Sequence, residues 1–334
     1  MSIFVYIAVD KINNVQYSHR MNVAIFGAAG ALGPVVAPEL LARGHRVRVV
    51  GRNAERLRAA VPGAEALAAD LMDPAGARAA AEGMDAILYA VGVPYNHFEL
   101  HPAMMRLTLD AAQAAGVKQL IHISNVYPYG RPQTPTVSET HPLATHTRKG
   151  TWRKLQEDLV LAAHDAEGLR TLILRPADFY GASATNGLAD YALRSIKAGK
   201  PADLLGPIDT PHEWVYVPDL APIVADLFAR PDAFGTAYNV AGPGTLTERE
   251  FVTKLFAAAG KPLRYRVAGP LLLSALGLFN PVMRELVEMN YLYGTPVLLD
   301  DGKLQRVLGT IRKTPYDDGI RANVEAVLKA PLAA

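Results

Sequence analysis

The stretch VAIFGAAGALG, residues Val23–Gly33, constrains the fold more than any other part of the chain. Its opening apolar run is too short for a helix, and a helical pattern begins only after Gly27, Gly30 and Gly33. A buried strand, a glycine turn and a helix start in this order are typical of a nucleotide-binding crossover. Gly27 would permit the turn, Gly30 would let a pyrophosphate approach the backbone, and Gly33 would let the helix pack closely on the strand. Free N–H groups at the helix start would then face an anion.

Composition narrows the class of partner. A chain of 334 residues with 50% hydrophobic residues can form one large domain or two coupled domains. A net charge of +2 leaves no basic stripe for nucleic acid, so we expect a small-molecule substrate. The absence of cysteine excludes disulfides, thiolate catalysis and cysteine-ligated zinc, and it permits the cytoplasmic location that we predict. No run reaches the ~20 apolar residues of a membrane span, and Pro270–Phe279 is interpreted as a core or oligomer helix.

Strand and helix patterns alternate after the glycine turn. Further strands are expected at 45–50, 64–69 and 86–94, and a fifth, together with its following loop, at 118–130, with helices between them. Gly44 is expected to end the first helix, and Asp73 is expected to cap a later one. The spacing predicts an α/β fold with a doubly wound parallel sheet and ligands at the carboxyl ends of its strands. Residues 1–20 precede this pattern without signal-peptide features, and we treat them as an N-terminal extension of unassigned role.

The end of the second strand bears on the choice of cofactor. An acid at this point suits the ribose hydroxyl of NAD, whereas an arginine suits the 2′-phosphate of NADP. The chain has no acid there and offers Arg52, with Arg48 and Arg56 nearby. We therefore predict that NADP(H) is preferred and NAD(H) is possible, the alternative being that these arginines form a solvated helix start. Asp70 follows the third strand, where an acid can bond the adenine amino group.

Eight segments of the sequence point to one family when they are taken together. The segments are GAAGALG, Asp70-Leu71, YAVG at 89–92, HISNVYPYG, LRPADFYG at 174–181, EWVYVPDLA at 213–221, AYNVAGPG at 237–244 and LDDGKLQRVLG at 299–309. In this order they resemble the extended short-chain dehydrogenase/reductase family, which contains nucleotide-sugar epimerases, dehydratases and 3β-hydroxysteroid dehydrogenases. The resemblance implies a nucleotide-binding Rossmann domain over 21–175 and a mainly substrate-binding part over 176–334, with segments near 213–222 and 236–242 returning to the first domain. It also suggests a homodimer.

One departure from the family pattern affects catalysis. Members carry a hydroxyl residue after the fifth strand and a Tyr-x-x-x-Lys helix motif, in which the tyrosine is the acid/base and the lysine binds the ribose. No Tyr-x-x-x-Lys occurs between Asn125 and Arg175. Alignment places Asn125 at the hydroxyl position, and Lys149 and Arg153 at the Tyr and Lys positions.

These replacements support a hypothesis for the acid/base. The Asn125 amide can polarise a carbonyl, and Arg153, on the same helix face as Lys149, can bond the ribose. Arg153 and an oxidised nicotinamide would both lower the proton affinity of Lys149, which would suit it as an acid. The alternatives are that Lys149 and Arg153 only bind the cofactor, or that Tyr127 or His146 is the acid.

The remaining candidates complete the predicted site. His97 and His101 stand four residues apart around Glu99, but this is not a metalloprotease motif, and we predict no metal. Arg194, Lys197 and Lys200 can bind a diphosphate or form a solvated face, and 262–293 suggests an apolar pocket or an oligomer contact. The predicted catalytic residues are Asn125, Lys149, Arg153 and Tyr127; the predicted cofactor contacts are Gly27, Ala29, Gly30, Ala31, Leu32, Gly33, Arg52, Asp70, Leu71, Ala90, Val91, Gly92, Ser124, Lys149, Pro176, Asp178 and Phe179.

The leading functional hypothesis is an NADP(H)-dependent oxidoreductase acting on a carbonyl or hydroxyl of a small, moderately apolar molecule. Two alternatives stay open. One is a nucleotide-sugar epimerase or dehydratase that retains NAD(P), and the other is a non-catalytic NADP(H)-binding sensor.

Overall fold

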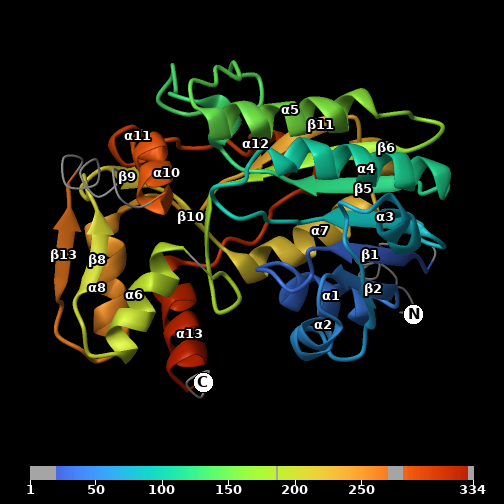
Figure 1. Ribbon diagram of the computed structural model, residues 1–334. Helices are drawn as coiled ribbons and strands as arrows, with labels where there is room; N and C mark the ends of the chain where they lie inside the picture. Colours follow the sequence, from blue (N-terminus) through green and yellow to red (C-terminus); the bar gives the residue numbers. More distant parts are fainter. Residues whose placement is uncertain (1–19, 186, 270–280, 330–334) are drawn as a thin grey trace, which may run out of the picture.

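The computed structural model describes residues 20–185, 187–269 and 281–329, which form a sheet-containing lobe and a smaller second lobe (Figure 1). The first lobe is built on a seven-stranded parallel sheet in the order β11-β6-β5-β4-β1-β2-β3, which confirms the predicted fold class. The strands are β1 (Asn22–Phe26), β2 (Arg46–Gly51), β3 (Glu65–Ala68), β4 (Ala86–Tyr89), β5 (Gln119–Ile123), β6 (Arg170–Pro176) and β11 (Thr236–Val240).

Helices cover both faces of this sheet (Figure 1). One face carries α1 (Gly33–Ala42), which packs on α7 (Leu220–Phe228), and α7 in turn contacts α12 (Gly302–Leu308). On the other face, α4 (Leu100–Ala114) lies between α3 (Pro74–Ala81) and α5 (Arg148–Ala162). The short α2 (Ala54–Ala60) joins β2 to β3. The 3₁₀ turns are η1 (Tyr127–Tyr129), η2 (Val217–Asp219) and η3 (Pro231–Ala233).

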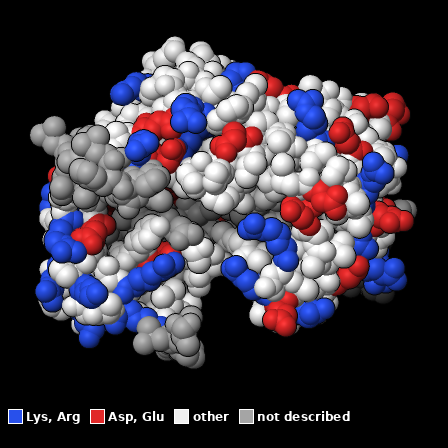
Figure 2. All heavy atoms as spheres, in the orientation of Figure 1, with Lys and Arg blue, Asp and Glu red and all other residues white. Residues whose placement is uncertain are grey.

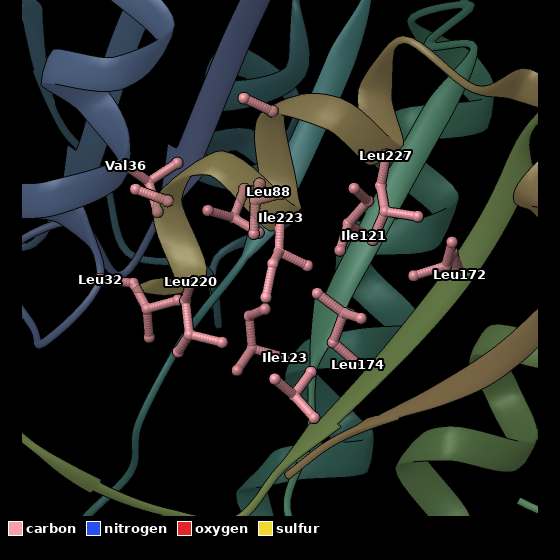
Figure 3. Packing of buried hydrophobic residues seen from close by; sticks show 14 of the residues in the cluster. Leu32, Val36, Leu88, Ile121, Ile123, Leu172, Leu174, Leu220, Ile223 and Leu227 are labelled. Carbon is pink, nitrogen blue, oxygen red and sulfur yellow. The ribbon is translucent and has the colours of Figure 1, made fainter. Parts of the chain in front are cut away.

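The alternation of side chains along buried strands divides the core of the first lobe into two layers. Val23 and Ile25 of β1 point to one layer, whereas Ala24 and Phe26 point to the other. In Figure 3, Ile223 of α7 lies over Ile123 and neighbouring strand residues, which shows how α7 closes the first layer. Because the inner strands β1, β4, β5 and β6 are buried on both faces, polar groups gather at the carboxyl edge of the sheet.

The second lobe has its own apolar core around Leu193, Phe251 and Trp214. Three short strand pairs build it, with one antiparallel pair, β9–β12, and two parallel pairs, β7–β10 and β8–β13. Its elements are β7 (Asp178–Tyr180), α6 (Leu188–Lys197), β8 (Ala202–Leu205), β9 (Pro211–His212), β10 (Trp214–Tyr216), β12 (Leu246–Thr247), α8 (Glu248–Ala258), β13 (Tyr265–Ala268), α10 (Pro281–Met289), α11 (Tyr291–Gly294) and α13 (Tyr316–Lys329).

Several local predictions are confirmed. Gly44 follows α1 with a φ of 85°, and the Asp73 carboxylate caps α3 by accepting bonds from the N–H groups of Ala75 and Gly76. The strand expected over 86–94 is shorter, because its pairing ends at Tyr89 and the following residues form a loop beside the glycine turn. The apolar stretch Pro270–Phe279 and nearly all of the N-terminal extension lie outside the described residues. In the described part of the chain, no helix is long and apolar enough to cross a membrane.

Candidate functional site

The glycine turn lies at the carboxyl end of β1, and its glycines have separate steric causes. Gly27 has a φ of 81°, and a Cβ there would lie 2.6 Å from the Ala90 carbonyl oxygen of the β4 loop. A Cβ on Gly33 would lie 1.8 Å from the Ala28 carbonyl oxygen, so only glycine lets α1 approach the turn. Gly30 is exposed, and a Cβ there would meet nothing closer than the Gly27 carbonyl oxygen at 3.2 Å. The surface over Gly30 is therefore open to a ligand.

The start of α1 fits a pyrophosphate. Leu32 occupies the N-cap position, where no side chain accepts a hydrogen bond from the helix, so the first N–H groups have no side-chain partner. This helix start follows β1, which lies between β4 and β2 in the sheet. The strand order runs in opposite directions on the two sides of the β1–β4 pair, so this is the topological switch point. Predicted contacts Ala29, Ala31 and Leu32 belong to this same turn. The residues present thus fit a dinucleotide at the predicted place.

The structure separates the arginines at the end of β2. Arg52 is exposed and has no hydrogen-bond or ion-pair partner among the described residues. Arg48, in contrast, bonds Glu65 at 2.9 Å and the Glu82 carbonyl at 2.7 Å, which gives it a structural role within the sheet lobe. Arg52 is therefore the side chain that can reach a ligand.

The other predicted adenosine contacts lie at the ends of β3 and β4. Asp70 is exposed, and its Oδ1 accepts a hydrogen bond from the Met72 N–H at 2.9 Å, while Leu71 is buried. Ala90, Val91 and Gly92 follow β4 in the loop that passes the glycine turn, and none is fully buried.

A buried network links β5, α5 and β6 beneath the site. Arg175 donates from Nη2 to Glu157 Oε2 at 2.7 Å, from Nε to both carboxylate oxygens at 3.1 Å, and from Nη1 to the Tyr129 hydroxyl at 3.0 Å. Ser124 is buried and donates its hydroxyl to the same carboxylate. Because the Ser124 hydroxyl donates to Glu157, a cofactor contact by Ser124 would involve its backbone.

Asn125 and Tyr127 follow this network at the carboxyl end of β5. The Asn125 Oδ1 accepts a hydrogen bond from the Tyr127 N–H at 3.1 Å, which leaves the Asn125 amide N–H groups free of side-chain partners in the described chain. Tyr127 stacks on Phe98 with 6.1 Å between ring centroids, and the Phe98 ring lies 5.4 Å from that of Tyr95. Burial, and next the negative charge of Asp178, raise the pKa of Tyr127 to about 12.

Lys149 is placed beside this aromatic cluster but in surroundings that the sequence did not indicate. Its Nζ lies 4.7 Å from the centre of the Tyr95 ring, donates to Glu288 Oε2 at 3.0 Å and also pairs with Glu285. The side chain of Lys149 is almost fully buried, whereas both glutamates remain partly exposed. Because α10 supplies these carboxylates, the electrostatic partners of Lys149 are anions, which oppose the cationic influence that we expected from Arg153.

Arg153 is turned away from Lys149 into a buried polar cluster. It donates to Gln156 Oε1 at 2.7 Å and approaches His101 Nδ1 and the Ile123 carbonyl, each at 3.4 Å. Its Nε has no partner among the described residues. Burial, and next the Arg153 charge, lower the pKa of His101 to about 2, so His101 is neutral at physiological pH. The predicted role of Arg153 at the ribose stays a prediction.

The chain leaves the sheet at Pro176 and enters the second lobe through β7. Pro176 is buried, Asp178 is reached by solvent, and Phe179 is half-buried. Surrounding protein desolvates the Asp178 carboxylate and raises its pKa to about 6. The Asp178 charge thus acts on Tyr127, whose backbone N–H is bonded to Asn125.

The structure also shows the surroundings of the other candidates. His97 precedes α4 and bonds Glu99 at 3.0 Å, whereas His101 is buried on the helix. His146 packs on Tyr291 with 4.4 Å between ring centroids. Arg194 of α6 is paired with Asp190 on the same helix, which favours the solvated-face interpretation of that helix.

The comparisons with known proteins agree with this geometry. The model of the NAD dependent epimerase/dehydratase family matches residues 23–241. The chain belongs to this family. It is an NAD(P)-dependent enzyme of the oxidoreductase or epimerase/dehydratase type, and the resemblance to extended short-chain dehydrogenases/reductases is confirmed. The match includes all seven strands of the sheet and the second-lobe elements from β7 to β10.

Its relatives differ in the reactions for which they are named. The chain is 29% identical over 247 residues to (4-alkanoyl-5-oxo-2,5-dihydrofuran-3-yl)methyl phosphate reductase of Streptomyces griseus, covering 74% of this chain and 77% of that protein. It is 27% identical to 3 beta-hydroxysteroid dehydrogenase/Delta 5-->4-isomerase of Mycobacterium tuberculosis, covering 74% and 72%. The crystal structure of Thermus thermophilus UDP-glucose 4-epimerase with NAD has a TM-score of 0.78 at 22% identity, covering 93% of this chain and 100% of that one. That likeness concerns the fold.

Proposed function

We propose that the protein is an NADP(H)-dependent reductase or dehydrogenase that acts on a carbonyl or hydroxyl group of a small, moderately apolar molecule. The observation that carries the cofactor preference is Arg52, which is exposed and unpaired in the described structure at the end of β2. A guanidinium there can form paired hydrogen bonds with a 2′-phosphate. The ring surfaces of Tyr95, Phe98 and Tyr127 support an apolar component in the substrate.

Asn125 and Lys149 each have a task in this proposal. Bound NADP(H) supplies or accepts the hydride. Asn125 orients the substrate oxygen through its amide N–H groups, because its own oxygen is held by the Tyr127 N–H. Lys149 exchanges the proton at that oxygen, and the partly exposed Glu285 and Glu288 connect its buried ammonium group with solvent. Tyr127 is a weaker candidate, since a pKa of about 12 makes it a poor proton donor near neutral pH.

The first experiment identifies the cofactor. The purified protein is denatured and any released nucleotide is identified by mass spectrometry, and the affinities for NADPH and NADH are then measured by fluorescence. We expect NADP, or an empty protein that binds NADPH more tightly than NADH. Near-stoichiometric NAD would overturn the preference and favour an epimerase or dehydratase that retains its cofactor. Binding of neither nucleotide would refute the proposal as a whole.

The Arg52→Ala variant tests the residue directly. Loss of charge-assisted bonds to a phosphate costs about 1.5–3 kcal/mol, which weakens NADPH binding by about ten- to a hundredfold. Affinity for NADH should stay unchanged. Arg58→Ala, which removes an exposed arginine from the far end of α2, is the matched control. Equal losses of affinity for NADPH and NADH would show that Arg52 does not bind the 2′-phosphate.

A further inference from the structure

Polar side chains without partners gather where the second lobe faces the aromatic cluster. Glu248, the first residue of α8, is 3% exposed, and its Oε2 has no hydrogen-bond partner in the described chain. His212 Nε2 is likewise buried without a partner there. Asp178 forms no side-chain hydrogen bond or ion pair with the described residues. Asp178 is exposed, whereas Glu248 Oε2 and His212 Nε2 are buried, and buried polar groups usually have partners, so a ligand that satisfies these two is a natural explanation.

Strand register brings these three residues together. Asp178 of β7 pairs with Trp214 of β10, and the Trp214 and His212 rings lie 5.6 Å apart. His212 of β9 pairs with Leu246 of β12, two residues before Glu248. The negative charge of Asp178 also contributes to the raised pKa of Glu248, which places the two carboxylates within electrostatic range of each other.

Tyrosine rings complete this group of residues. The ring of Tyr293 lies 6.2 Å from that of His212, and the charges of both Glu248 and Asp178 act on its hydroxyl. The Asp178 charge also raises the pKa of Tyr95 and of Tyr127 in the aromatic cluster. We call Tyr95, Tyr127 and Tyr293 the pocket tyrosines. The same rings already attract one ammonium group, because Lys149 Nζ lies over the Tyr95 ring.

Basic side chains in these elements are paired with other acids. Arg249, next to Glu248, bonds Asp209 at 2.6 Å, and Lys149 is held by Glu285 and Glu288. Residues 270–280, which the structure does not describe, contain no charged residue. Neither Asp178 nor Glu248 has a cationic partner in the described chain. When both are ionised, Asp178 and Glu248 therefore give this group of residues an excess of negative charge, which would repel a diphosphate and attract a cation.

We propose that the substrate carries a cationic nitrogen, either a protonated amine or a quaternary ammonium group, which binds between Asp178 and Glu248 beside the pocket tyrosines. The inference rests on the proposed function, because it places this cation on the molecule whose carbonyl or hydroxyl group reacts. Aromatic faces combined with carboxylates suit such a group, since both attract a cation while the rings contact its apolar substituents. The rest of the substrate can be apolar.

Titration of the Asp178 and Glu248 carboxylates predicts how the binding of a cation depends on pH. The neighbouring protein raises the pKa of Asp178 to about 6, and burial, with the Asp178 charge, raises that of Glu248 to about 8. His212 is neutral above its lowered pKa of about 4, and burial keeps the pocket tyrosines protonated. The carboxylates lose protons as pH rises from about 5 to 9, so affinity for a permanent cation should rise over that range. A neutral ligand should show no such rise.

Two isosteric ketones test the proposal. N,N-dimethyl-4-oxopiperidinium is a permanent cation, and 4,4-dimethylcyclohexanone has nearly the same shape without charge. Calorimetric titration at pH 8, with and without NADPH, should show about tenfold or greater preference for the cation. Glu248→Gln and Asp178→Asn should each remove most of this preference. Asp110→Asn, which removes an exposed carboxylate from α4, should keep it.

The outcomes separate this inference from the proposed function. Equal affinity for the two ketones, binding of neither, or a preference unchanged in Glu248→Gln and Asp178→Asn would overturn the cationic substrate. A preference for the cation without NADPH-dependent reduction of either ketone would leave the binding site standing and count against hydride transfer to this type of substrate.

Discussion

Replacing Arg175 by methionine tests whether the buried network under the site is a main source of its stability. Glu157 is fully buried, and Arg175 provides three of its hydrogen bonds at 2.7–3.1 Å. Without the guanidinium, the carboxylate keeps only the Ser124 hydroxyl as a side-chain donor among the described residues. Breaking one partner of a buried ion pair costs about 3–5 kcal/mol, because the remaining charge is left uncompensated. We expect the free energy of unfolding to fall by that amount.

The same helix offers a matched control. Lys154 pairs with Asp158 at 2.7 Å, but both side chains are more than one-third exposed. Lys154→Met should therefore cost about 0.5 kcal/mol or less. The double variant Glu157→Met/Arg175→Met should recover most of the loss seen in Arg175→Met, since neither charge remains unpaired.

Urea unfolding followed by tryptophan fluorescence measures these differences, with Trp152 in the first lobe and Trp214 in the second as reporters. Separate transitions for the two lobes would assign the loss to the lobe that contains Glu157. If Arg175→Met lost no more stability than Lys154→Met, or if the double variant were no better than Arg175→Met, the reasoning from burial would be refuted.

Two further substitutions test the cofactor and catalytic assignments. Lys149→Met should abolish turnover and leave NADPH affinity within a few-fold, as measured by steady-state kinetics and fluorescence titration; turnover equal to that of Lys154→Met would rule out Lys149 as the acid/base. Gly33→Ala should lower NADPH affinity at least about tenfold, because the new Cβ would lie 1.8 Å from the Ala28 carbonyl oxygen and force α1 off the turn. Gly269→Ala, where a Cβ would meet nothing within 4 Å, is its control, and equal affinities in both variants would contradict the steric argument.

Local sequence signals were sufficient to predict the main helices, strands and turns of the sheet-containing lobe. The glycine spacing, the Asp73 cap and the Gly44 helix end are properties of adjacent residues, so the sequence displays them directly. The alternation of strand and helix patterns predicts the doubly wound parallel sheet, because parallel crossovers have one strongly preferred hand, but it leaves the strand order open. The predicted strand over 86–94 was too long, since small apolar residues have the same sequence pattern in a strand and in a loop packed against the glycine turn.

Contacts between residues far apart in the chain could not be predicted from local sequence patterns. Glu157 of α5 and Arg175 of β6 appear as ordinary charged residues in the sequence, and their pairing depends on how α5 packs against the sheet. Glu248 likewise gives no signal as the first residue of an ordinary capped helix, although its carboxylate is buried without a partner in the described chain. Pairing or its absence can be judged only when the neighbouring elements are known.

Lys149 shows how such contacts change a chemical argument. On its own helix the neighbouring charge is Arg153, which led to the expectation of a lysine in cationic surroundings. In the structure, the Arg153 guanidinium bonds to Gln156, while carboxylates from 136 and 139 residues away reach the Lys149 ammonium group. A proton given up by Lys149 can then be replaced through Glu285 or Glu288. The unit to be tested as the acid/base is therefore the lysine together with the two glutamates of α10.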